Sequence, residues 1–200
     1  MISHPSLLRV EDTVVVAIDL QGAFLKVIHD ADRVLANARL LLQSAAILGV
    51  PVIATTQNAA RLGGVDESVA PLLEAAGSPG RGGCASPTTG ASVIDKMVFS
   101  AARCPDFATA LTSLGRKQIV LCGVETHICV TQTALDLRAA GHQVHVAVDA
   151  CSSRSMEKHK LGMERLRDNG ALPIATEAAV YELLGQAGTP AFKQILPLVK

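Results

Sequence analysis

The strongest constraint on the fold is an alternation of strand and helix patterns along the chain. Residues 13–18 form a continuous β-branched apolar run, typical of a strand buried on both faces. Residues 31–48 then place apolar side chains at helical spacing and stop at Gly49, a residue suited to end a helix. Such alternation with short connections indicates right-handed crossovers and parallel strands. We therefore predict an α/β fold: a three-layer, doubly wound, mainly parallel six-stranded sheet with helices on both faces.

The remaining predicted elements continue this alternation. Further strands are predicted at residues 50–55, 91–94, 118–122, 142–148 and 171–175. Further helices are predicted from residue 66 or 68 to 76, at 105–114, from 129 to 140, at 156–168, and as two short helices at the end, the second opening at Thr189-Pro190. Residues 77–90 are rich in Gly, Pro, Ser and Thr, a composition that predicts an exposed loop. No apolar strand precedes their glycines, so a dinucleotide- or phosphate-binding loop is not expected there. Without a linker, residues 1–200 are expected to form a single domain.

Composition excludes several function classes. Lys and Arg number 18 against 18 Asp and Glu, and no dense basic run is interleaved with aromatics, so a nucleic-acid partner is not expected. The longest apolar stretch, near residues 45–54, is broken by Gly49 and Pro51, so no membrane span is predicted. Zero net charge favours a homo-oligomer. The odd cysteine number and the lack of a secretory signal predict free thiols and a cytoplasmic location.

Cys129 stands at the start of a predicted helix. It lies in Gly-Val-Glu-Thr-His-Ile-Cys-Val, directly after the apolar strand at residues 118–122. Unpaired backbone N–H groups and the positive end of the helix dipole favour a thiolate there. Because the thiolate is the nucleophilic form, Cys129 is a candidate catalytic nucleophile. Cys122, within the strand, is interpreted as an inert buried side chain.

Asp19 and Lys96 end two other predicted strands, at the sheet edge where ligands bind in such folds. Each has a simpler interpretation. Asp19 can cap a helix or anchor a loop, and Lys96 can form a surface ion pair with Asp95. Near a thiol, however, an aspartate can accept and return a proton, and an ammonium favours the thiolate. The three side chains at one edge predict a reacting unit.

These motifs together resemble a known family. Asp19 lies in Ile-Asp-Leu-Gln, Lys96 follows Val-Ile-Asp, and the segment around Cys129 continues as Thr-Gln-Thr-Ala-Leu-Asp-Leu. Over nearly the whole chain they resemble the isochorismatase-like cysteine hydrolases, and most closely the isochorismatase-domain-containing group. The resemblance implies the isochorismatase-like hydrolase fold.

The resemblance also implies roles for individual residues. Cys129 would attack a carbonyl or nitrile-type carbon, Asp19 would relay the proton, and Lys96 would orient both. The family has a cis peptide that falls here between Val124 and Glu125, so the N–H groups of Glu125 and Cys129 would form an oxyanion hole. The expected substrate pocket consists of Gln21, Phe24, Thr56, Gln57 and Val124.

Departures from the wider superfamily narrow the expected reaction. Its nicotinamidases bind a metal with an Asp and several His after the second strand, whereas residues 55–61 here contain no His and no acid. We therefore expect no metal and no cofactor, and no nicotinamide hydrolysis. True isochorismatases lack the catalytic cysteine, so Cys129 argues against that activity. The expected function is a metal-independent cysteine hydrolase that cleaves an amide C–N bond of a small molecule through a thioester-type intermediate.

Two alternatives remain open at this point. One is a catalytically vestigial protein of the same fold that acts as a scaffolding oligomer. The other is a ribonuclease, against which the zero net charge argues. The sequence does not define the substrate.

Overall fold

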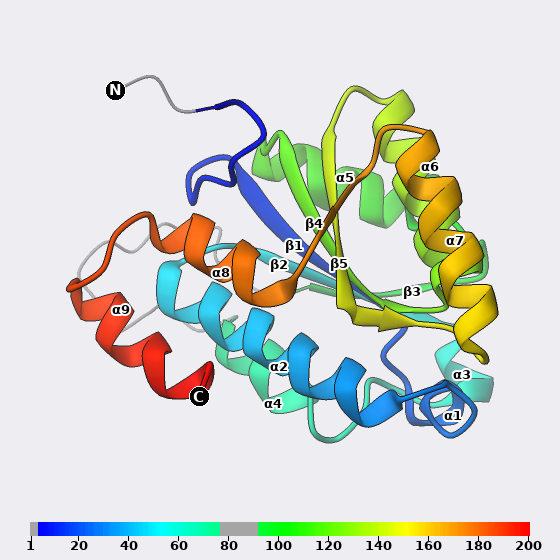
Figure 1. Cartoon of the computed structure of the whole chain (residues 1–200). Coiled ribbons are helices and arrows are strands. Elements are labelled where there is room, and N and C mark those ends of the chain that lie inside the picture. Colours follow the sequence, from blue (N-terminus) through cyan, green and yellow to red (C-terminus); the bar gives the residue numbers. More distant parts are fainter. Residues whose placement is uncertain (1–3, 77–91) are drawn as a thin grey trace.

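The computed structural model describes residues 4–76 and 92–200, in which six parallel strands form one sheet in the order β3-β2-β1-β4-β5-β6. Helices cover both of its faces (Figure 1). The strands are β1 (Thr13–Ile18), β2 (Val52–Gln57), β3 (Ser92–Lys96), β4 (Gln118–Val124), β5 (Gln143–Ser152) and β6 (Leu172–Ile174). The predicted α/β fold class, with its six-stranded parallel sheet, is confirmed.

The helices follow the predicted alternation, with short additions near the strand ends. They are α1 (Gly22–Leu25), α2 (Ala31–Leu48), α3 (Ala59–Leu62), α4 (Ala70–Ala76), α5 (Pro105–Leu114), α6 (Thr131–Ala139), α7 (Met156–Asp168), α8 (Thr176–Leu184) and α9 (Pro190–Ile195). Two 3₁₀ turns, η1 (Ala101–Arg103) and η3 (Leu196–Leu198), and a π-helical turn, η2 (Thr126–Val130), complete the described elements. None of the helices in the described ranges is long and apolar enough to cross a membrane.

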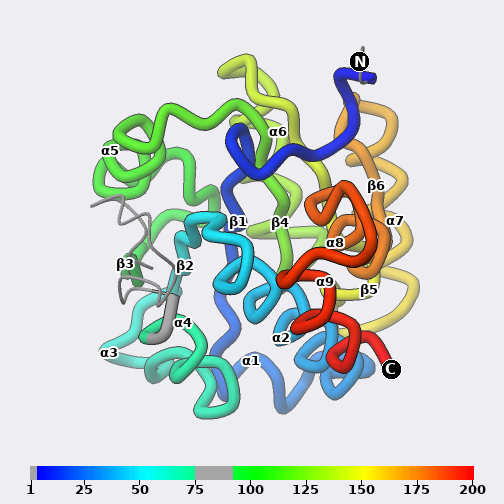
Figure 2. The backbone as a smooth tube through the Cα atoms, turned by 90° about the vertical axis from the view of Figure 1, so that its left-hand side faces the viewer, coloured from blue at the N-terminus to red at the C-terminus, as the bar shows by residue number. Residues whose placement is uncertain are grey.

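Two hydrophobic cores, one on each face of the sheet, explain the continuous apolar run of β1. Val15 and Ala17 pack on the face covered by α2, α4, α8 and α9, whereas Val14, Val16 and Ile18 pack on the face covered by α5, α6 and α7. Side chains of a strand alternate between faces, so a strand covered on both sides is apolar at every position. All six residues of β1 are buried. The view turned by 90° shows the helices on either side of the sheet (Figure 2).

Several element boundaries differ from the sequence-based prediction. The second and third strands run on to Gln57 and Lys96, because these two residues pair with each other in the parallel ladder. The fifth strand likewise runs on to Ser152. Cys129 lies in the π-helical turn η2, and the regular helix α6 starts two residues later. Helices α1 and α3 were not predicted, and the predicted loop at residues 77–90 lies outside the described residues.

The direction of winding changes between β1 and β4, so the switch point of the sheet lies at the carboxyl ends of these two strands. From β1 the chain proceeds to β2 and β3 on one side, and it then returns to place β4 on the other side of β1. Ligands of doubly wound sheets bind at such a switch point. Asp19 directly follows β1, and Glu125 directly follows β4.

Candidate active site

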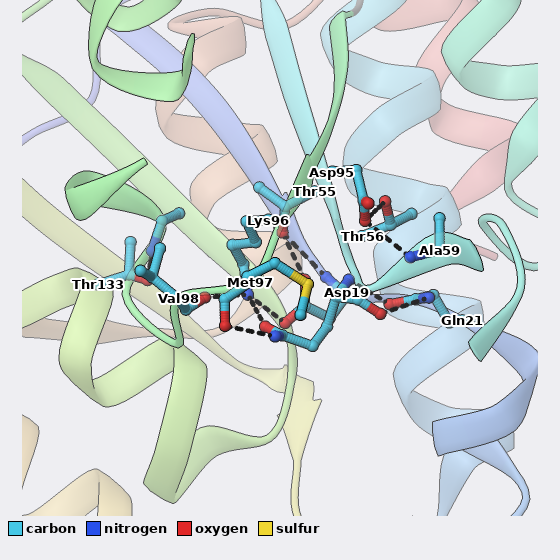
Figure 3. A network of polar contacts seen from close by, with 12 residues as sticks. Asp19, Gln21, Thr55, Thr56, Ala59, Asp95, Lys96, Met97, Val98 and Thr133 are labelled. Atoms are coloured by element: carbon cyan, nitrogen blue, oxygen red, sulfur yellow. Dashed lines mark hydrogen bonds and ion pairs between the residues drawn. The ribbon is translucent and has the colours of Figure 1, made fainter. Parts of the chain in front are cut away.

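A buried ion pair between Lys96 and Asp19 forms the centre of the site (Figure 3). Lys96 Nζ donates to Asp19 Oδ2 and to Gln57 Oε1, both at 2.8 Å, and to the carbonyl oxygen of Val98 at 3.4 Å. The second carboxylate oxygen of Asp19 accepts a 2.7 Å hydrogen bond from Thr55 Oγ1. Removing two charges from water is costly unless further hydrogen bonds accompany the pair. Here three acceptors use the three donors of the ammonium.

The backbone of Asp19 turns sharply at the end of β1. Its φ of 50° lies in the left-handed region, which residues other than glycine rarely adopt. The N–H of Asp19 donates to the carbonyl oxygen of Thr55 at 3.1 Å, so β2 holds the turn. Residues in such conformations persist only where the surroundings determine them, and they concentrate at functional sites.

Gly123 allows β4 to approach the same strand end. Its φ is 113°, and a Cβ at this position would lie 2.0 Å from the carbonyl oxygen of Ile18. Only glycine permits both this dihedral and this contact. The peptide bond that follows the next residue, between Val124 and Glu125, is cis. Gly123 thereby brings the segment that leads to Cys129 against the residue preceding Asp19.

Cys129 lies beside the ion pair, but its protonation state differs from the sequence-based prediction. Burial, first of all, together with the charge of Asp19 and a hydrogen bond with its carboxylate raises the pKa of the Cys129 thiol to about 12, although Lys96 acts to lower it. The side chain is 6% exposed. The expected thiolate is therefore wrong for this form of the site, because desolvation and the adjacent carboxylate disfavour a second negative charge. At neutral pH the sulfur is a thiol facing a carboxylate.

An arginine holds the segment between β4 and Cys129. Glu125 Oε2 accepts hydrogen bonds from the backbone N–H of Arg154 at 3.1 Å and from its Nε at 3.0 Å. The adjacent Thr126 Oγ1 lies 2.9 Å from His159 Nδ1 on α7. These contacts fix the orientation of the peptide groups directly before the nucleophile candidate.

The five expected pocket residues occupy different environments. Gln57 contacts the site directly, since its Oε1 accepts from Lys96 and its Nε2 donates to the carbonyl oxygen of Met97 at 2.9 Å. Gln21 is fully buried and holds the backbone of β2, with its Oε1 accepting from the N–H of Gln57 at 2.6 Å. The other three positions are Thr56, buried and bonded to Asp95; Val124, fully buried; and Phe24, partly buried against the core.

Structure adds participants that the sequence did not indicate. Thr55 bonds the carboxylate of Asp19, and the carbonyl oxygen of Val98 completes the shell of Lys96. Strand β2 lies between β1 and β3, and its residues Thr56 and Gln57 were already expected in the substrate pocket. The adjacent Thr55 could therefore have been predicted as a site residue. No sequence signal identifies a backbone carbonyl, since every residue carries one. Asp95, next to Lys96, points elsewhere and accepts from the N–H of Ala59, which lowers its pKa.

A separate cavity lies away from this centre. It encloses about 640 Å³ and is lined mainly by α7 together with residues of β5 and β6. Neither the ion pair nor Cys129 lines it. Within residues 4–76 and 92–200, no group of three or more His, Cys, Asp or Glu side chains is arranged to hold a metal ion.

Comparison with solved structures defines the class of protein. The fold matches the MAR1 ribonuclease from Caenorhabditis elegans, with a TM-score of 0.82, 29% sequence identity, and coverage of 96% of this chain and 91% of that chain. It also matches the ycaC gene product of Escherichia coli, an octameric hydrolase of unknown specificity, with a TM-score of 0.84, 21% identity and coverage of 98% and 92%. The architecture is therefore that of the isochorismatase-like hydrolases.

Sequence comparison then gives the family. The model of the isochorismatase domain matches residues 13–178, and this chain belongs to the isochorismatase family. It is 36% identical to the secreted isochorismatase effector Isc1 of Phytophthora sojae, over 91% of this chain and 81% of that protein. It is 32% identical to isochorismatase domain-containing protein 1 of Salmo salar, over 94% of this chain but 61% of that protein.

Proposed function

We propose that this chain is a metal-independent cysteine hydrolase that cleaves an amide C–N bond in a small molecule. One observation carries the proposal: the Cys129 thiol lies beside the carboxylate of a fully buried Asp19–Lys96 ion pair, at the switch point of the sheet. A thiol that faces a carboxylate has a proton acceptor in place, and the acceptor is held by Lys96 and Thr55. This is the arrangement of a nucleophile with an oriented base.

The protonation states suggest the order of events. Because the pKa of Cys129 is raised, the sulfur loses its proton to Asp19 only as it attacks the amide carbon. The N–H groups of Glu125 and Cys129 are the proposed donors to the resulting oxyanion. Asp19 then returns the proton to the departing nitrogen as the C–N bond breaks, which leaves a thioester. A water molecule then attacks this thioester while it transfers a proton to Asp19. As the C–S bond breaks, Asp19 passes that proton to the sulfur, which releases the carboxylic acid and restores both the thiol and the carboxylate.

An amide suits this site because its leaving group needs a proton. An amine leaves poorly as an anion, so cleavage requires a general acid, and Asp19 carries the proton of Cys129 at that stage. Lys96 makes no such transfer in this scheme. Its ammonium is held by three acceptors and keeps the carboxylate in position.

The test is release of amine or ammonia from a panel of small amides. Wild type is expected to cleave at least one of them and to form an acyl adduct detectable by mass spectrometry. Cys129→Ala should lose the adduct and at least 1,000-fold of the rate, on the order of other nucleophile deletions. Cys104→Ala, which removes another buried free thiol, is the matched control and should retain activity. Equal hydrolysis by Cys129→Ala would refute the proposal.

Ribonuclease activity is the second candidate, favoured by the name of the Caenorhabditis elegans structure. Against it stands the zero formal charge, because RNA binding normally needs a basic surface. Cleavage of labelled RNA that disappears in Cys129→Ala, with an affinity that falls steeply as salt increases, would favour the ribonuclease over the amide hydrolase.

Cytoplasmic location and homo-oligomerisation remain predictions. One relative is named a secreted effector and one solved neighbour is octameric, and these names describe those proteins. Fractionation of tagged protein in its own cells tests the location. Sedimentation velocity at micromolar concentration tests the assembly, and also the alternative of a scaffolding oligomer without activity.

A further inference from the structure

The segment directly after Lys96 exposes three consecutive apolar side chains. Met97 is 70% exposed, Val98 40% and Phe99 55%. The other large apolar side chains exposed in the described part of the chain stand singly in the sequence. A run of exposed apolar residues is unfavourable in water unless it serves binding. We call these three residues the apolar loop.

Backbone contacts hold the apolar loop to the candidate active site. The carbonyl oxygen of Met97 accepts from Gln57, and that of Val98 accepts from Lys96. Two residues beyond Phe99, the N–H of Ala101 donates to Thr133 Oγ1 at 2.9 Å. Thr133 lies on α6, four residues after Cys129. The loop therefore connects the ends of β2 and β3 to the helical segment that carries the nucleophile candidate, and Figure 3 shows Met97 and Val98 beside the ion pair.

The polarity of the surroundings indicates what the loop would contact. The carbonyl oxygens of Met97 and Val98 face inward to Gln57 and Lys96, and the exposed side chains of the loop carry no charge. Lys96 has no donor left for an anionic group of a substrate, since Asp19, Gln57 and Val98 use all three. A neutral substrate with an apolar substituent fits this environment better than an anion does.

We propose that the apolar loop, Met97–Val98–Phe99, binds an alkyl or aryl substituent of the substrate, so that the preferred substrates are neutral amides with an apolar group. This inference deepens the proposed function and rests on the assignment of Cys129 as nucleophile. Each methylene that the loop shields from water should strengthen binding about two- to fourfold, in keeping with the free energy of burying one CH₂.

The experiment measures alkylation of Cys129 by N-methyl-, N-propyl- and N-hexyl-chloroacetamide. In each reaction the sulfur forms a bond to the CH₂ carbon, chloride leaves, and the thiol proton goes to base. Peptide mapping by mass spectrometry gives the rate at Cys129, divided by the rate of the same reagent with free glutathione. In wild type we expect this normalised rate to be at least tenfold higher for the N-hexyl reagent than for the N-methyl reagent.

Substitutions in the apolar loop test whether its side chains cause the preference for the longer alkyl group. Phe99→Ser and Met97→Ser should each reduce the hexyl-to-methyl ratio to about threefold or less, on the order of one or two methylenes of shielding. Leu161→Ser, which alters another exposed apolar side chain on α7, should keep the wild-type ratio. All three positions are exposed, and a thermal melt checks that each variant is folded. A flat series in wild type, or a ratio unchanged in both loop variants, overturns the proposal.

A second copy of the chain is the competing occupant. If sedimentation shows a smaller assembly for Phe99→Ser than for wild type while the ratio is unchanged, the loop is an interface between copies and the proposal fails. Failure of the two proposals is distinguishable. Steep alkylation without amide hydrolysis supports the apolar loop and refutes the hydrolase, whereas hydrolysis with a flat alkylation series does the reverse.

Discussion

The ammonium of Lys96 lies 2.8 Å from the carboxylate of Asp19, and both side chains are almost completely shielded from water. The two residues are 77 positions apart in the chain and follow or end different strands, with β2 lying between those strands. The pair is stable because Thr55, Gln57 and Val98 supply its remaining hydrogen bonds. The same ion pair that stabilises this edge of the sheet also supplies the proposed base for Cys129.

Replacing one member of the pair should destabilise the fold more than replacing both. Lys96→Met leaves a buried carboxylate without its cation, and Asp19→Asn leaves a buried ammonium without its anion. Each should lower the free energy of unfolding by about 3–5 kcal/mol, whereas the double variant should lose clearly less than the sum. Urea denaturation of the four proteins measures this. Strict additivity would show that the two charges do not interact.

Asp19→Asn should make Cys129 more reactive as a thiol while abolishing the proposed hydrolysis. The carboxylate raises the pKa of Cys129 and Lys96 lowers it, so removing the carboxylate leaves the influence of Lys96. Alkylation by iodoacetamide at pH 8 should accelerate several-fold, up to about tenfold for each unit by which the pKa falls. The matched control is Asp95→Asn, a carboxylate directed away from the thiol. Slower alkylation in Asp19→Asn would contradict the placement of the two side chains.

Gly123→Ala should disrupt the contact between β1 and β4. The new methyl group would lie 2.0 Å from the carbonyl oxygen of Ile18, and alanine disfavours a φ of 113°. We expect a loss of about 3 kcal/mol or more in the free energy of unfolding. Gly115→Ala is the control, because its φ is also positive at 62° but no atom lies within 4 Å of the added carbon. That variant should lose about 1 kcal/mol. Equal losses would argue against the close approach.

Stability should fall as the pH rises above about 9. Burial raises the pKa of Cys122 and Cys129 to about 12 from the ordinary value of 9.0, and it also raises that of Cys151. Above pH 9 the unfolded chain releases these protons while the folded chain retains them. The free energy of unfolding therefore falls by up to about 1.4 kcal/mol per pH unit for each thiol. Urea denaturation between pH 8 and 10.5 with reductant tests this, and Cys129→Ala should show a shallower fall than wild type.

Local patterns were sufficient to predict the architecture. The β-branched run of β1 and the helical spacing of α2 each follow from the direct neighbours in the chain, and the structure confirms both elements. Because parallel strands end at a common edge, the order of elements also directed attention to Asp19, Lys96 and Cys129. The predicted carboxyl ends of the strands were less accurate than the predicted elements themselves. Thr56, Gln57 and Lys96 are strand residues because of their ladder partners, which sequence periodicity does not reveal.

The chemical state of the site depended on the tertiary structure. Sequence placed Cys129 at a helix start and implied a thiolate, but burial and the charge of Asp19 give a thiol. Gln21, expected in the substrate pocket, is enclosed and bonds the backbone of β2. The inward carbonyl of Val98 and the outward side chains of the apolar loop were likewise invisible in the sequence.

Hydrophobic periodicity and strand order are properties of local segments, so they were sufficient to predict the sheet, its helices, and three candidate site residues at or after strand ends. The folded arrangement was needed to show that Asp19, Gln57 and Val98 use all three donors of Lys96, that burial and Asp19 raise the pKa of Cys129, and that the side chains after Lys96 face solvent. Desolvation and hydrogen-bond pairing depend on groups distant in sequence, and these two quantities set charge states and partners.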